Sequence, residues 1–214
     1  MAASTSAKRS VIWLHGLGDT GAGWSSLAST FAPRLPSVAW QFPNAPVRPV
    51  TLSPGYDMPA WFDLNDLPVT AATPATAADY AHGTSIVHGL IDAEVAKGVA
   101  PEHIVLGGFS QGGALSLYAG LRYPKRLGGI VSFSGWLPLW EEQLKPLPGL
   151  GGAKVLMVHG SRDDKVLFER GQHARDTLTP VAGKVEWHEF RGGHEFHQPS
   201  VTWLEGFLKE ALGL

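Results

Sequence analysis

The sequence predicts a single α/β domain in which helices cover both faces of a mostly parallel central sheet. Short apolar runs of strand length alternate along the chain with longer helical segments, and this alternation is typical of doubly wound sheets. The chain has 214 residues, which suits one domain, and it shows no internal repeat and no linker-like stretch. We therefore expect a short disordered N-terminus over residues 1–9 and one folded domain over residues 10–214.

The N-terminal part of the chain begins with a predicted buried strand. Residues 11–14 are an apolar run followed by a His-Gly pair, and residues 38–42 form a second apolar run. Between them, residues 24–31 indicate a helix that Pro33 stops. Residues 43–76 are rich in Pro, Thr and Ala without a clear period, and a connection of this length is often functional.

The clearest predicted helix covers residues 76–98. Thr76 and Asp79 match a capping box at its start, and Gly98 suits the left-handed position that ends a helix. Apolar side chains recur on one stripe of this segment, at Tyr80, Val87, Leu90, Ile91 and Val95. The alternation then continues, with strands expected at 104–106, 130–133, 155–158 and 185–190 and helices at 111–122 and 199–212.

Charge and composition exclude several classes of protein. The chain carries 17 basic and 19 acidic residues, a net charge of −2, without a run of Lys and Arg, so no nucleic-acid partner is predicted. It has no cysteine, which excludes disulfides and thiolate metal ligands. The first residues are polar, and the apolar run after them is too short for a signal sequence or a membrane span. We therefore expect a soluble cytoplasmic protein.

Ser110 is the candidate nucleophile. It lies in Gly-Phe-Ser-Gln-Gly, residues 108–112, between a predicted strand and a predicted helix. A nucleophile elbow requires this context, because its tight turn needs glycine two residues before and two residues after the serine. The following helix also places Ser110 at its positive end, which favours nearby negative charge. A glycine-rich turn with an incidental serine is the alternative, and the presence of partner residues decides between the two.

The candidate acid lies in the loop after the predicted strand 155–158. A serine hydroxyl needs a histidine to take its proton, and the histidine needs a carboxylate that fixes its tautomer. Enzymes with this elbow carry the three residues in the chain order Ser, Asp or Glu, His. The loop offers Asp163 and the adjacent Asp164, and we favour Asp163 from its spacing to Gly160 and Val166. Asp164 is interpreted as a solvated loop carboxylate or as an acidic residue in the first turn of the next helix.

The loop after the last predicted strand supplies the candidate base. His194 follows a pair of glycines that lets the loop approach the serine closely, whereas His197 is interpreted as a surface or helix-entry histidine. His15 and His159 each precede a glycine at a strand end, where we expect a structural hydrogen-bonding role. A metal site built from His194, Glu195 and His197 lacks the helical zincin spacing and an evident third ligand, so no metal is predicted.

Residues 16–21, Gly-Leu-Gly-Asp-Thr-Gly, match the dinucleotide-binding pattern G-x-G-x-x-G. The acidic residue that should follow about 20 residues later is missing, and Asp19 would place a negative charge beside the pyrophosphate. We therefore expect no cofactor and interpret the segment as an oxyanion loop. Leu17 is its candidate amide donor, and Gln111, directly after the nucleophile, supplies the other amide.

Together these residues resemble the acyl-protein thioesterase family, also called the lysophospholipase/carboxylesterase family. The matching stretches span nearly the whole chain and are residues 15–21, 43–52, 58–64, 106–114, 136–139 and 160–166, together with His194. The resemblance implies one α/β-hydrolase domain without a large lid, with Ser110, Asp163 and His194 as the catalytic triad and with oxyanion amides at Leu17 and Gln111. It also implies an apolar acyl channel, whose candidate residues are Trp61, Trp136, Leu137 and Leu139, with core packing as their alternative role.

The activity that the resemblance implies is hydrolysis of acyl thioesters on S-acylated proteins. Broad carboxylesterase or lysophospholipase activity, on acyl esters or lysophospholipids, is the alternative, and a ligand-binding receptor with a hydrolase fold is the non-enzymatic one. We expect at most transient contact with a membrane surface, and a monomer or weak homodimer. The chain departs from the family in two respects, because it lacks the N-terminal cysteine that some eukaryotic members lipidate, and residues 65–82 match weakly.

Overall fold

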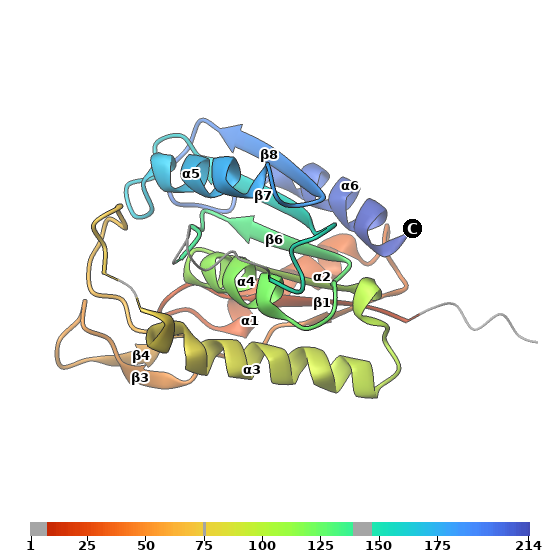
Figure 1. Cartoon of the computed structure of the whole chain (residues 1–214), viewed down its shortest axis with the longest axis horizontal. Coiled ribbons are helices and arrows are strands. Elements are labelled where there is room, and N and C mark those ends of the chain that lie inside the picture. The colour runs from red at the N-terminus through yellow and green to blue at the C-terminus, as the bar shows by residue number, and fades with distance from the viewer. Residues whose placement is uncertain (1–7, 75, 139–146) are drawn as a thin grey trace, which may run out of the picture.

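The computed structural model describes residues 8–74, 76–138 and 147–214. Its centre is a six-stranded sheet in the order β2-β1-β5-β6-β7-β8, in which every neighbouring pair is parallel (Figure 1). The predicted parallel α/β architecture is therefore confirmed. The strands of the sheet are β1 (Arg9–Leu14), β2 (Val38–Gln41), β5 (Ile104–Phe109), β6 (Gly129–Phe133), β7 (Lys154–Gly160) and β8 (Lys184–Phe190).

Helices cover both faces of this sheet, as Figure 1 shows. They are α1 (Gly21–Trp24), α2 (Ser26–Phe31), α3 (Ala77–Ala96), α4 (Gln111–Arg122), α5 (Phe168–Leu178) and α6 (Ser200–Leu212), with a short 3₁₀ turn at Pro101–His103. The alternation of β1 sets the two cores: Ile12 and Leu14 pack with α3 and α4, whereas Val11 and Trp13 pack with α2 and α6. A third cluster lies between α4, α5 and the strands β6 and β7.

The ends of α3 follow the sequence prediction closely. Thr76 and Asp79 form the expected capping box, and the Thr76 backbone N–H donates to Asp79 Oδ2 over 2.6 Å. Gly98, just after the helix, has φ 87°, which is the left-handed conformation that glycine adopts without strain. Beside α3, the central helix α4 is buried from Gln111 to Leu121, because it lies beneath the middle of the sheet.

Some elements differ from the prediction. The helix expected over residues 24–31 is two short helices that meet at Ser25, and the helix expected after Asp164, for which no bounds were predicted, is α5. The long connection after β2 contains an antiparallel hairpin of β3 (Val47–Pro49) and β4 (Asp57–Pro59). The first strand, β1, begins at Arg9, which pairs with Val38, so it starts two residues before the strand predicted over residues 11–14.

Candidate active site

A strained turn presents Ser110 at the carboxyl end of β5. Its backbone has φ 55° and ψ −118°, and a positive φ is uncommon for any residue other than glycine. Close contacts explain the flanking glycines, because an added Cβ would lie 2.6 Å from the Leu14 carbonyl oxygen at Gly108 and 2.2 Å from it at Gly112. The turn therefore raises the Ser110 side chain above the sheet at the N-terminus of α4, which is the geometry of a nucleophile elbow.

Loops at the same edge of the sheet bring a histidine and a carboxylate to Ser110. His194 follows β8, and its Nε2 lies 2.8 Å from Ser110 Oγ. Its Nδ1 lies 2.7 Å from Oδ2 of Asp163, which follows β7 and is 5% exposed. The structure thus joins the three side chains that the sequence singled out in one hydrogen-bonded series.

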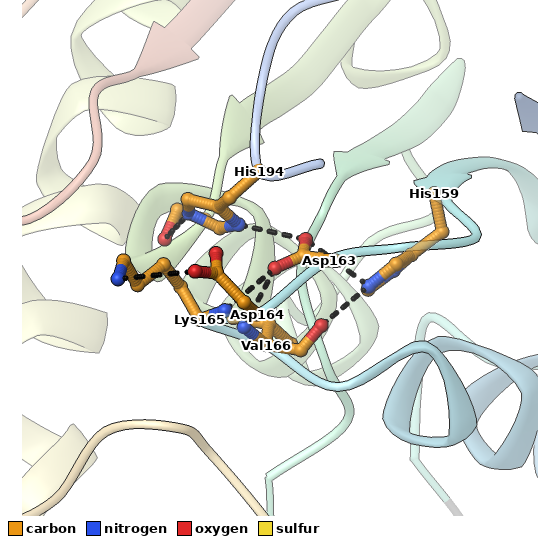
Figure 2. A network of polar contacts seen from close by, with 7 residues as sticks. His159, Asp163, Asp164, Lys165, Val166 and His194 are labelled. Carbon is orange, nitrogen blue, oxygen red and sulfur yellow. Dashed lines mark hydrogen bonds and ion pairs between the residues drawn. The ribbon is translucent and has the colours of Figure 1, made fainter. Parts of the chain in front are cut away.

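The turn that carries Asp163 also fixes its carboxylate. Oδ1 accepts hydrogen bonds from the backbone N–H groups of Lys165 and Val166, each over 2.9 Å (Figure 2). Burial acts to raise the pKa of Asp163, but the hydrogen bonds from His194 and from these amides outweigh it, so the pKa lies below its usual value. Asp163 is therefore ionised at neutral pH. Its competitor Asp164 has a side chain that is 75% exposed and pairs with Lys165.

The aromatic contacts of His194 and His197, the two candidate bases in the loop after β8, differ. The His197 ring stacks on Phe190, with centroids 4.6 Å apart and planes within 1° of parallel. By contrast, the His194 ring contacts Phe109, the residue before the nucleophile, at a centroid distance of 4.8 Å. His197 therefore has a packing position, whereas His194 is held beside Ser110.

Buried hydrogen bonds anchor the loop that follows β1. His15 donates its Nδ1–H to the Gly16 carbonyl oxygen over 2.7 Å, and its Nε2 accepts the backbone N–H of Ala45 over 3.0 Å. Burial lowers the pKa of His15, which agrees with the neutral ring that these two contacts require. Leu17 comes next on this loop and lines the same cavity as Gln111. Both predicted oxyanion residues therefore border the cavity that contains the nucleophile.

In the glycine pattern at residues 16–21, polar groups that could contact a bound dinucleotide instead form hydrogen bonds with other residues of the protein. Gly21 opens a helix of only four residues, and its backbone N–H donates to Oδ1 of Asn44 over 2.7 Å. The Asp19 carboxylate accepts the indole N–H of Trp24 over 2.8 Å. A dinucleotide site would instead offer free amides and a long helix to a pyrophosphate, so these contacts favour the oxyanion-loop interpretation.

Trp61, a candidate for the acyl channel, lies beneath the oxyanion loop. It is fully buried, and its indole N–H donates to the His15 carbonyl oxygen over 2.9 Å. Its backbone N–H donates to Oε1 of Gln111, whose Nε2 donates to the Phe62 carbonyl oxygen, each over 2.9 Å. Trp61 does not border the cavity beside Ser110 and packs in the core, which is the alternative role that the sequence analysis gave it. Its polar atoms connect the two segments that carry the predicted oxyanion amides.

A cavity of about 310 Å³ opens beside Ser110. Trp136 lines it as expected, together with residues that the sequence analysis did not single out for the site: Leu64, Leu67, Val69, Phe109, Lys165 and Val166. A second cavity of about 190 Å³ shares Leu64, Val69 and Trp136 with the first. Leu137 borders only the second cavity, and Leu139 lies outside the described residues.

A short backbone contact joins the cavity wall to the turn that carries Asp163. Val69 pairs with Val166 in a parallel bridge, and the Val69 N–H donates to the Lys165 carbonyl oxygen over 2.7 Å. The N–H of Leu167 donates back to the Val69 carbonyl oxygen over 3.4 Å. Sequence reasoning missed this contact because the segment around residue 69 has no period and its partner lies far along the chain.

Among the residues that the structure describes, no three His, Cys, Asp or Glu side chains form a group that could hold a metal ion. No helix within the described ranges is long and apolar enough to cross a membrane. Among the described residues, those with nucleophilic or titratable side chains that line the cavity are Asp19, Ser110, Lys165 and His194.

Comparison with known proteins places this geometry in a family. The phospholipase/carboxylesterase family model matches residues 1–212. A probable carboxylesterase of Oryza sativa subsp. japonica is 40% identical over 216 residues, which cover 99% of this chain and 81% of the relative. Acyl-protein thioesterase 1 of Gibberella zeae is 37% identical over 212 residues, covering 94% and 90%. The crystal structure of Arabidopsis thaliana SOBER1 matches with a TM-score of 0.90 and 35% identity, covering 96% of this chain and 100% of that chain. The chain belongs to the phospholipase/carboxylesterase family of the α/β-hydrolase superfamily.

Proposed function

We propose that the protein is a serine hydrolase that cleaves acyl esters and thioesters through an acyl-enzyme on Ser110. The series of contacts from Ser110 Oγ through His194 to Asp163, at 2.8 Å and 2.7 Å, carries this proposal. Family membership supports the same class of reaction, since relatives are named carboxylesterases and acyl-protein thioesterases.

The proposed reaction begins with attack by Ser110 Oγ on the acyl carbonyl carbon. Nε2 of His194 takes the hydroxyl proton, and ionised Asp163 stabilises the imidazolium through its Nδ1–H. The backbone N–H groups of Leu17 and Gln111 stabilise the negative charge that develops on the carbonyl oxygen. His194 then gives the proton to the departing alcohol or thiol. Water attacks the acyl-enzyme by the same route, which releases the carboxylic acid and restores Ser110.

Acyl thioesters of S-acylated proteins are the proposed substrates within this class, with carboxylic esters and lysophospholipids as the alternative. Leu17, Leu64, Leu67, Phe109 and Trp136 give the cavity an apolar wall that suits an acyl chain. Thioesters and oxygen esters use the same reactive groups, so matched pairs of both, with short and long acyl chains, separate the substrate classes. A strong preference for acetyl to butyryl chains would overturn the depalmitoylation proposal.

Labelling with a fluorophosphonate probe tests the proposed nucleophile. We expect the wild-type protein to react and Ser110→Ala to remain unlabelled. Ser116→Ala is the matched control, because Ser116 is a buried serine of α4, the helix that begins directly after Ser110, and donates to the Gly112 carbonyl oxygen instead of contacting His194. A folded wild-type protein that fails to react would overturn the proposal. Tight binding of acyl ligands without turnover would favour the receptor alternative.

A further inference from the structure

A buried histidine lies behind the proposed catalytic carboxylate. His159, near the end of β7, is 1% exposed, and its Nε2 lies 2.9 Å from the Val166 carbonyl oxygen (Figure 2). The same nitrogen lies 3.4 Å from Oδ2 of Asp163, the oxygen that faces His194. Because a carbonyl oxygen can only accept, Nε2 of His159 must carry a hydrogen. This N–H therefore points into the turn that holds the acid.

We propose that His159 is a positioning residue for the reaction. Its Nε2–H donates to the Val166 carbonyl oxygen and lies beside Oδ2 of Asp163, and so orients the carboxylate that accepts the Nδ1–H of His194. His159 does not border the catalytic cavity, so it acts through Asp163 and not through contact with substrate. The inference rests on the catalytic roles proposed above for Asp163 and His194.

Packing fixes the His159 ring in place. A Cβ on Gly171 of α5 would lie only 2.4 Å from Nδ1 of His159, so the helix backbone is in close contact with that edge of the ring. The rings of Phe168 and Trp187 lie 6.0 Å and 6.4 Å from it, the latter nearly parallel. A ring held this closely offers its N–H at one position, which is the property that a positioning residue needs.

Val166 is held at both of its backbone polar groups. Its N–H donates to Oδ1 of Asp163 over 2.9 Å, and its carbonyl oxygen accepts from His159. Loss of the His159 donor would therefore release one side of the turn and remove a donor from beside Oδ2 of Asp163. Burial lowers the pKa of His159, while the nearby titrating groups Asp163 and His194 act in opposite directions, which agrees with a neutral ring.

Three substitutions at residue 159 separate positioning from simple packing. His159→Leu removes the donor, His159→Gln keeps an N–H at a similar reach, and His159→Asn keeps the amide but is one methylene shorter. His88→Leu is the matched control, since His88 also contacts a backbone carbonyl through Nε2, that of Ala119 over 2.9 Å, but lies on α3 outside the cavity lining.

We expect His159→Leu to lower kcat about 10- to 100-fold with KM little changed, because small misplacements of a catalytic group cost rates of this order. In the pH profile of kcat/KM, we expect the acidic side of the His159→Leu curve to shift to higher pH by about half a unit to one unit. The reason is that Asp163, without the His159 donor, attracts the proton of His194 more strongly. His159→Gln should recover most of both properties, while His159→Asn should not. The His88→Leu control should change thermal stability alone.

Titration of reactive Ser110 with a fluorophosphonate accompanies each measurement. An unreactive wild-type protein would overturn the proposed function itself, whereas a reactive one leaves the role of His159 to be judged separately. A folded His159→Leu protein with wild-type kcat and pH profile would overturn the positioning role. If His159→Leu does not fold, His159→Gln and His159→Asn are compared instead. Equal kcat values and equal pH profiles for these two variants would overturn the positioning role, whereas near wild-type values for His159→Gln alone would support it.

Discussion

Replacement of Asp163 by asparagine tests the proposed triad, because the structure determines how the new amide must lie. Oδ1 of Asp163 accepts the backbone N–H groups of Lys165 and Val166, so the asparagine oxygen must take that place. The side-chain NH₂ then faces Nδ1 of His194, which has to accept a hydrogen bond instead of donating one. The hydrogen of the neutral ring moves to Nε2, and His194 can no longer take the proton of Ser110.

The expected loss in kcat is about 10⁴-fold, the size found for the same change in other Ser-His-Asp enzymes, or about 5 kcal/mol of transition-state stabilisation. KM should change little, because Asp163 does not border the cavity. The assay measures kcat and KM on a nitrophenyl ester and a matched thioester, corrected for the fraction of reactive Ser110. Asp164→Asn is the control, and its exposed ion pair predicts a kcat within about twofold of wild type. An Asp163→Asn protein that keeps more than about one-tenth of the wild-type kcat would contradict the proposed role of Asp163.

Two further predictions concern stability. Gly112→Ala places a Cβ 2.2 Å from the Leu14 carbonyl oxygen and should cost on the order of 3 kcal/mol or more, whereas Gly89→Ala on α3, with nothing within 4 Å, should stabilise by about 0.5–1 kcal/mol. Urea titrations of both variants measure their free energies of unfolding, and similar changes for Gly112→Ala and Gly89→Ala would contradict the prediction. Burial lowers the pKa of His15 and of His159, so below about pH 6.5 the unfolded chain binds protons that the native protein does not. The free energy of unfolding should therefore fall with decreasing pH, by up to about 1.4 kcal/mol per unit for each histidine, until their lower native pKa values are reached. Unfolding curves near pH 7.5 and near pH 5.5 measure it, and equal stabilities would be the contrary result.

Short sequence patterns predicted those parts of the fold that depend on contacts between residues close together in the chain. The elbow around Ser110 was predicted because its glycines are required by contacts that every such turn makes. The bounds of α5 were not predicted, because most of its side chains are polar and only a few of its residues, among them Ala174 and Leu178, are buried. The family resemblance made Trp61 a candidate for the acyl channel, with core packing as the alternative, because the sequence does not reveal the carbonyl oxygen that accepts its indole N–H.

The meeting of Ser110, Asp163 and His194 could be predicted from the order of these residues along the chain. Asp163 and His194 follow strands that end at the same edge of the sheet as Ser110, so their order in the chain indicated their meeting. The cavity wall was not predictable, since Val69 reaches it through a bridge to Val166 that no local pattern encodes. The support of Asp163 by His159 likewise depends on side-chain packing between α5 and β8.

The bridge between Val69 and Val166 uses main-chain atoms alone. The size of the cavities and the position of the turn that carries Asp163 can therefore be altered independently. Val69 lines both cavities and its side chain takes no part in the bridge, so an exchange of this side chain is expected to alter the cavities while the bridge persists. Insertion or deletion of residues just before position 69 would instead pull on Val166 and move the acid-bearing turn. The size of the cavity is thus open to point substitution, whereas the length of this connection is constrained by the position of Asp163.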